Sequence, residues 1–137
     1  MHHLDAGVQP ALRVVEPALW ARGVASLDAL VLTHGDPDHI GGAPLLVNDF
    51  HPSLLWQGID VPKAASLQAV LARSAALGVP AQTRHTGEVF RVGDVRIIVL
   101  NPEAPTWERP RVRNDDSLVL EIIYGDTAFL LLGDVGV

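Results

Sequence analysis

The strongest constraint on the fold is a change of pattern near the middle of the chain. In the first half, short apolar runs of strand length alternate with segments of helical periodicity, the clearest of them over Ala64–Leu77. In the second half only strand patterns occur, in two pairs joined by the turn dipeptides Gly93-Asp94 and Gly125-Asp126. Alternation predicts parallel strands with helices packed on them, whereas the strand pairs predict antiparallel hairpins. The expected class is therefore α/β, or α+β by a stricter definition.

Most elements can be placed to within a few residues. Helices are expected over Leu12–Arg22 and Ala64–Leu77, and a third near Gly42–Val47. Leu27–Leu32 is an almost continuous apolar run, which is typical of a strand buried on both faces. The remaining strands are expected over residues 54–56, 88–92, 95–100, 117–124 and 127–132.

Composition excludes several classes of protein. Of the 137 residues, 48% are hydrophobic and 19% are charged, which allows a packed core and argues against disorder. The apolar runs are far shorter than the roughly 20 residues of a membrane-spanning helix. The chain has no cysteine, so any metal ion must be held by His and carboxylate side chains. The net charge of -6 argues against broad electrostatic wrapping of nucleic acid.

A polar segment directly after the first strand holds most of the side chains that bind metals. His34, Asp36, Asp38 and His39 lie within six residues, in a segment that also contains glycine and proline. A turn lets these side chains converge, whereas in a regular strand they would alternate in direction. Imidazole and carboxylate donors suit Zn, Mn or Fe. The alternative is an ordinary polar turn in which Asp36 or Asp38 caps the next helix.

The order and spacing of these residues, followed by Gly41 and Gly42, resemble the HxHxDH signature of the metallo-β-lactamase fold, with Asp36 at the place of the second histidine. The form HxDxDHxGG is similar to the C-terminal hydrolase domain of the competence protein ComEC and its relatives. Four further segments match that family in order, namely Leu4–Gly7, Val14–Gly23, Asn114–Leu120 and Leu131–Asp134. The resemblance covers nearly the whole chain and implies part of an αβ/βα sandwich.

The resemblance also implies a site for two divalent transition-metal ions, Zn or Mn. His34 and Asp36 match ligands of the first ion, and Asp38 and His39 match ligands of the second. Asp134 matches the carboxylate that bridges both ions, so Asp38 and Asp134 are the candidate catalytic residues. Two ions about 4 Å apart can polarise a phosphoryl oxygen and stabilise the leaving oxygen of a phosphodiester.

Four more residues match positions close to such a site. Asp5 resembles a carboxylate that supports the metal loop, although capping of an ordinary turn explains it equally well. Arg113 and Asn114 stand where the family has its third histidine, and Ser117 begins the strand that follows. The last histidine and the opening strands of the family have no counterpart in residues 1–137. We therefore expect a single, incomplete domain of this fold over residues 1–137.

The implied function is a metal-dependent hydrolase, and the ComEC-like loop favours a phosphodiesterase that acts on DNA during DNA uptake. Arg109, Arg111 and Arg113 favour a phosphate-contacting edge, because guanidinium groups bind phosphate oxygens in pairs, but a solvated loop explains them as well. Two alternatives stay open: hydrolysis of a thioester, lactam or lactone at the same site, and a catalytically inactive interaction module. The expected partners are DNA and a membrane channel domain of the same parent protein. Such a parent places the site outside the bacterial inner membrane, whereas a free-standing hydrolase would be cytoplasmic.

The other histidines and the tryptophans are assigned no chemical role. His51 and His85 are expected at the surface, because histidine is often at least partly exposed in folded proteins. Trp20, Trp56 and Trp107 are expected to pack against other side chains, because no basic residues alternate with them as they do in proteins that bind single strands.

Overall fold

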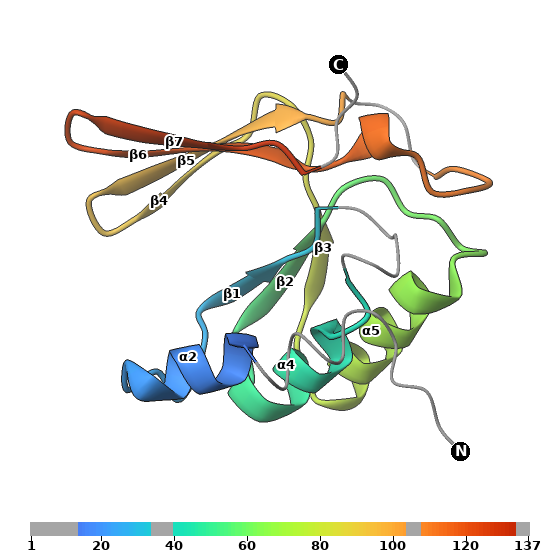
Figure 1. Cartoon of the computed structure of the whole chain (residues 1–137). Helices are drawn as coiled ribbons and strands as arrows, with labels where there is room; N and C mark the ends of the chain where they lie inside the picture. The colour runs from blue at the N-terminus through green and yellow to red at the C-terminus, as the bar shows by residue number, and fades with distance from the viewer. Residues whose placement is uncertain (1–13, 34–39, 104–107, 134–137) are drawn as a thin grey trace.

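Three layers of secondary structure build the molecule: helices, a three-stranded sheet and a four-stranded sheet (Figure 1). The computed structural model describes residues 14–33, 40–103 and 108–133. Within these ranges, no helix is long and apolar enough to cross a lipid bilayer. The helices are α2 (Glu16–Ala21), α4 (Ala43–Phe50) and α5 (Ala65–Ala76).

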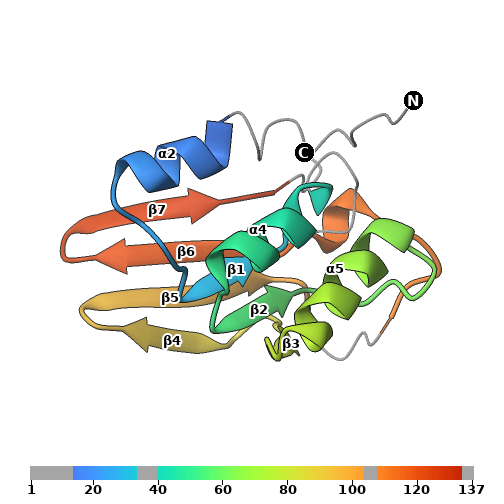
Figure 2. The same ribbon diagram turned by 90° about the horizontal axis from the view of Figure 1, so that it is seen from below.

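The three-stranded sheet is entirely parallel, with the order β1-β2-β3. Parallel neighbours need a crossover connection, and α4 and α5 provide the two crossovers. Both helices lie across the outer face of this sheet (Figure 2). The carboxyl ends of all three strands therefore meet at one edge, where parallel α/β sheets commonly bind their ligands. The strands are β1 (Ala29–Val31), β2 (Leu54–Gln57) and β3 (Ala81–Thr83).

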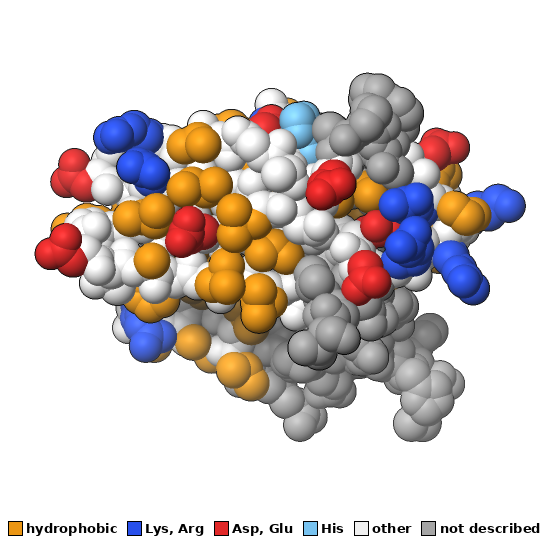
Figure 3. All heavy atoms as spheres, turned by 90° about the horizontal axis from the view of Figure 1, so that it is seen from above, with side chains coloured by type: hydrophobic (Ala, Val, Ile, Leu, Met, Phe, Trp, Pro, Cys, Tyr) orange, Lys and Arg blue, Asp and Glu red, His pale blue; other side chains and the backbone are white. Residues whose placement is uncertain are grey.

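The four-stranded sheet is antiparallel, with the order β4-β5-β6-β7. Its two hairpins turn at the predicted Gly-Asp dipeptides, and a 3₁₀-helix at Asn114–Asp116 precedes β6. Its outer face carries exposed apolar side chains, among them Val89 and Leu130 (Figure 3). The strands are β4 (Val89–Val92), β5 (Val95–Asn101), β6 (Val119–Tyr124) and β7 (Thr127–Leu131).

Two apolar clusters hold the layers together. The first lies between the helices and the parallel sheet and includes Val47, Leu55 and Val70, all fully buried. The second lies between the two sheets and is formed by Trp56, Val99, Leu118 and Leu120. Full burial of one such side chain stabilises the fold by about 1.5–3 kcal/mol, so the second cluster fixes the two sheets against each other.

Most predicted elements are confirmed, but three differ from expectation. Of the first predicted helix, residues 12–13 lie outside the described ranges, and regular α-helix in the described remainder covers Glu16–Ala21, where Pro17 occupies the first turn. The first strand is shorter than predicted, at Ala29–Val31, and only partly buried: Leu30 packs on the helix side and Val31 against the other sheet, as expected for a strand covered on both faces, but Ala29 is exposed. Strand β3 was missed, since its three residues are all exposed and carry no apolar pattern.

Candidate functional site

The predicted metal ligands lie in two segments outside the described residues, and the structure describes the residues beside these segments. The structure describes neither residues 34–39 nor residues 134–137. In the described part there is no group of three or more His, Cys, Asp or Glu side chains that could hold a metal ion. The predicted site residues that lie outside the described ranges are Asp5, His34, Asp36, Asp38, His39 and Asp134, and Trp107 lies outside them as well.

The residues that precede these two segments, Thr33 and Gly133, meet at the carboxyl end of β1. Gly133 has a φ of +58°, which L-residues rarely adopt. A Cβ on Gly133 would lie 2.9 Å from Cβ of Ser117 and 3.1 Å from Cβ of Thr33, closer than packed carbon atoms approach. Only glycine therefore fits at this point. The residue before His34 and the residue before Asp134 are in close proximity, as a metal site shared by the two segments requires.

Ser117 lies at the same point and is fully buried. We call Thr33, Ser117 and Gly133 together the corner. The next residue, Leu118, donates its backbone N–H to the carbonyl oxygen of Thr33 at 2.6 Å, which joins the two sheets. The side-chain amide of Asn101 donates to the carbonyl oxygens of Asp115 and Ser117, both at 2.8 Å. Backbone hydrogen bonds thus hold the start of β6 against the end of β1.

Arg113 and Asn114 lie just before the corner. The backbone of Asn114 begins the 3₁₀-helix, and Arg113 places its Nε 3.7 Å from a carboxylate oxygen of Asp116. The same oxygen lies 3.0 Å from Nε of Arg109. Two guanidinium groups on one carboxylate fix the arginine-rich segment onto the 3₁₀-helix, although the Arg113 side chain stays 46% exposed.

A small pocket beside Thr33 contains a polar group that the sequence pattern did not reveal. Gln57 ends β2 and lines this pocket, which has room for about one water molecule. Oxygen Oε1 of Gln57 is buried and accepts no hydrogen bond from the described residues. A buried acceptor at the carboxyl edge of the sheet is available to a ligand or to the metal loop. In the sequence, the signal for this acceptor is the position of Gln57, a polar residue at the end of an apolar strand.

The remaining histidines and tryptophans lie mainly as expected. His51 and His85 are exposed, which confirms the prediction for both. Trp56 is buried between the two sheets, and Trp20, about half exposed, stacks on Phe50 with ring centroids 5.6 Å apart. Neither histidine shows a role in the site.

One titratable group in the described part of the chain is clearly perturbed. Glu16 is buried at the start of α2. Burial raises the pKa of Glu16 from 4.5 to about 7, and a side-chain hydrogen bond and the charge of Asp49 act in the same direction. Both carboxyl groups belong to the helix layer, so this perturbation concerns stability more than the chemistry of the corner.

Two comparisons with known proteins each cover most of the chain. Residues 4–136 match the metallo-β-lactamase superfamily, and the match includes both segments that hold the predicted ligands. ComE operon protein 3 of Bacillus subtilis (strain 168) is 35% identical over 123 residues. These residues make up 90% of this chain but 16% of that relative, so the chain spans about a sixth of its length. The chain belongs to the metallo-β-lactamase superfamily.

Proposed function

We propose that this chain carries the catalytic centre of a metal-dependent phosphodiesterase that acts on DNA. The observation that carries the proposal is the contact of Gly133 with Ser117 and Thr33. It brings the chain positions before His34 and Asp134 to one corner at the carboxyl end of the parallel sheet. Similarity to ComE operon protein 3 supports a hydrolase role in competence. DNA as the substrate, and a channel domain of the same parent protein as the partner, are part of the proposal.

The donor set fits a pair of divalent ions. His34, Asp36, Asp38, His39 and Asp134 offer two imidazoles and three carboxylates, which suit Zn or Mn. Two such ions, when bound, polarise a phosphoryl oxygen and lower the pKa of water.

The described residues supply the framework for these ligands. Gly133 allows the end of β7 to approach Thr33, and the hydrogen bonds of Asn101 hold Ser117 at the corner. Arg113 places a half-exposed cation near the corner, where it would bind a phosphate oxygen. Asp5 would orient an imidazole of the metal loop.

Turnover of bis-p-nitrophenyl phosphate in the presence of Mn²⁺ or Zn²⁺ tests the proposal. Asp38→Asn and Asp134→Asn should each lower turnover at least about 100-fold, the usual cost of removing a group that stabilises the transition state. Asp28→Asn is the matched control, because Asp28 is an exposed carboxylate before β1, and it should leave turnover unchanged.

A parallel assay with a chromogenic lactam and a thioester separates the alternatives. Faster turnover of either compound than of the phosphodiester would contradict the proposed substrate and favour the second kind of hydrolase. The absence of metal-dependent turnover of all three compounds would contradict any catalytic role and favour an interaction module.

A further inference from the structure

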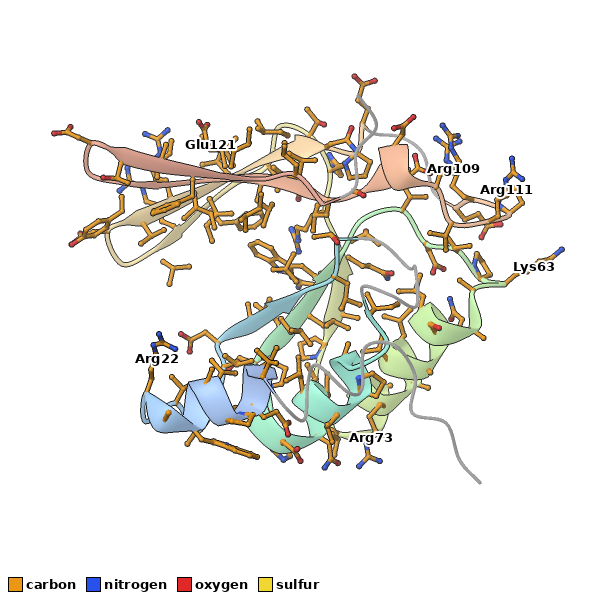
Figure 4. All side chains as sticks on the ribbon, in the orientation of Figure 1. Arg22, Lys63, Arg73, Arg109, Arg111 and Glu121 are labelled. Atoms are coloured by element: carbon orange, nitrogen blue, oxygen red, sulfur yellow. The ribbon has the colours of Figure 1, made fainter. Side chains whose placement is uncertain are left out.

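Several cationic side chains gather at one end of the molecule, away from the hairpin turns of the four-stranded sheet. Lys63 comes from the loop between β2 and α5, and Arg109, Arg111 and Arg113 come from the segment before the 3₁₀-helix. Figure 4 shows Lys63, Arg109 and Arg111 together at this end, and Figure 3 shows the basic side chains grouped there. We call these four residues the basic rim.

Backbone contacts fix the two loops of the rim to each other. The N–H of Arg109 donates to the carbonyl oxygen of Asp60 at 2.8 Å, and Asp60 and Glu108 form an isolated parallel bridge. The guanidinium of Arg109 binds both carboxylate oxygens of Asp116, at 3.0 and 3.4 Å. Because Asp116 directly precedes Ser117, Arg109 ties the rim to the corner where the proposed ligands begin.

Adjoining hollows connect the corner to the rim. The small pocket beside Thr33 shares Asp116 with an open hollow of about 200 Å³. That hollow shares Arg109 with a second one of about 310 Å³, which Lys63 lines. Shared lining residues thus place the three hollows next to one another between Thr33 and Lys63.

The charge of the rim is only partly neutralised by the protein. Lys63 and Arg111 make no ion pair with any residue that the structure describes, and Arg113 is half exposed. The two larger hollows are also lined by four carboxylates, those of Glu103, Glu108, Asp115 and Asp116, and Asp116 is paired with Arg109 and Arg113. These carboxylates repel an anion, so the charge available to a ligand is that of the exposed Lys63 and Arg111 and of the exposed part of Arg113. Separate exposed cations fit a ligand with separate negative charges, such as a single nucleic-acid strand with one phosphate per nucleotide.

We propose that the basic rim binds the backbone phosphates of the DNA strand to one side of the scissile bond. Lys63, Arg111 and Arg113 contact phosphates, and Arg109 is a positioning residue that holds the rim to the corner. This inference rests on the proposed function for its substrate class. It adds a binding surface outside the reacting site, and this surface would favour a strand of several nucleotides over an isolated phosphodiester.

Binding of a fluorescent twelve-nucleotide phosphorothioate oligothymidylate, followed by anisotropy in Mn²⁺ at several salt concentrations, tests the rim. Lys63→Gln/Arg111→Gln should weaken binding roughly tenfold and flatten the slope of log K against log salt by about 1.4, since each lost single-strand phosphate contact accounts for about 0.7. Arg22→Gln/Arg96→Gln is the matched control, because it removes the same charge from exposed residues on α2's end and on β5. It should change the affinity less than about twofold.

Turnover of bis-p-nitrophenyl phosphate by the unsubstituted chain, measured alongside, separates the two proposals. If the unsubstituted chain shows no turnover but Lys63→Gln/Arg111→Gln still weakens binding of the oligonucleotide, the proposed catalysis is overturned and phosphate binding by the basic rim is supported. Turnover together with an unchanged affinity and salt slope in Lys63→Gln/Arg111→Gln would overturn the rim. Equal weakening in both double variants, or no binding by the unsubstituted chain, would overturn the rim as well.

Discussion

Replacing Gly133 by alanine should open the corner at which the two sheets and the proposed ligands meet. The new Cβ would lie 2.9 Å from Cβ of Ser117 and 3.1 Å from both Oγ of Ser117 and Cβ of Thr33. Ser117 is fully buried, and the neighbouring residue is hydrogen bonded to Thr33, so neither obstacle can move freely.

Two costs add in this variant. Alanine at a φ of +58° costs about 1–2 kcal/mol relative to a right-handed conformation, a cost that glycine escapes. Overpacking of a buried contact costs about 1–3 kcal/mol. The free energy of unfolding should therefore fall by about 2–5 kcal/mol, a large fraction of the about 5–15 kcal/mol of an ordinary domain. Metal affinity should fall too, because Thr33 and Gly133 are pushed apart.

Gly125→Ala is the matched control for the strain alone. Gly125 has the same φ of +58°, but a Cβ there has no atom within 4 Å. This variant should lose only about 1–2 kcal/mol. Urea denaturation, followed by tryptophan fluorescence, to which the buried Trp56 contributes, measures the free energy of unfolding of both variants. The difference between them, about 1–3 kcal/mol, isolates the crowding at the corner.

Removal of the obstacle should restore part of the stability. Ser117→Gly in the Gly133→Ala background deletes the two nearest atoms, so the double variant should be less unstable than the sum of the single variants. If Gly133→Ala and Gly125→Ala are equally unstable, or if the two substitutions at the corner are additive, the corner is not closed as described.

Two further predictions concern stability away from the corner. Because the pKa of Glu16 is raised to about 7, Glu16 keeps its proton in the folded chain between pH 4.5 and 7, whereas the unfolded chain loses it. The free energy of unfolding should therefore fall by up to about 3 kcal/mol as the pH rises through this range. Urea midpoints at pH 5 and 8 should show this fall in the wild type and not in Glu16→Gln; parallel changes would contradict it. The guanidinium of Arg84 lies over the ring of Trp56, 5.3 Å from its centroid. Arg84→Lys should therefore lower the free energy of unfolding by about 1 kcal/mol in thermal denaturation. The control Arg91→Lys, at an exposed position, should change it by less than about 0.5 kcal/mol. Equal effects of the two lysine substitutions would contradict the stacking.

The fold was predictable wherever burial leaves a periodic pattern in the sequence. Helix α5 buries Leu67 and Val70 on one face, and the two hairpins are marked by alternating residues and Gly-Asp turns. Strand β3 left no such pattern, because its backbone pairs with β2 while its side chains stay exposed. The full length of β1 was overestimated because an apolar run does not show where hydrogen-bonded pairing stops.

For the candidate site, the sequence predicts residue types but not an arrangement. Spacing and family resemblance predict the ligands His34, Asp36, Asp38, His39 and Asp134, which lie outside the described residues, so this stays a prediction. The contact of Thr33 with Gly133 joins residues far apart in the chain, so no local pattern could predict it. The orphaned oxygen of Gln57 was missed for a related reason, since its burial depends on residues distant in the sequence, such as Leu32 and Val112, that line the same pocket.

Metal content measured by plasma mass spectrometry, on the chain purified without chelator and then incubated with Zn²⁺ or Mn²⁺, tests the central claim most directly. The account predicts one to two ions per chain in the wild type and loss of the metal in His34→Ala/His39→Ala. His51→Ala/His85→Ala, which removes two exposed histidines, should keep the metal. Full metal content in the His34→Ala/His39→Ala variant, or none in the wild type, would contradict a metal centre in this chain.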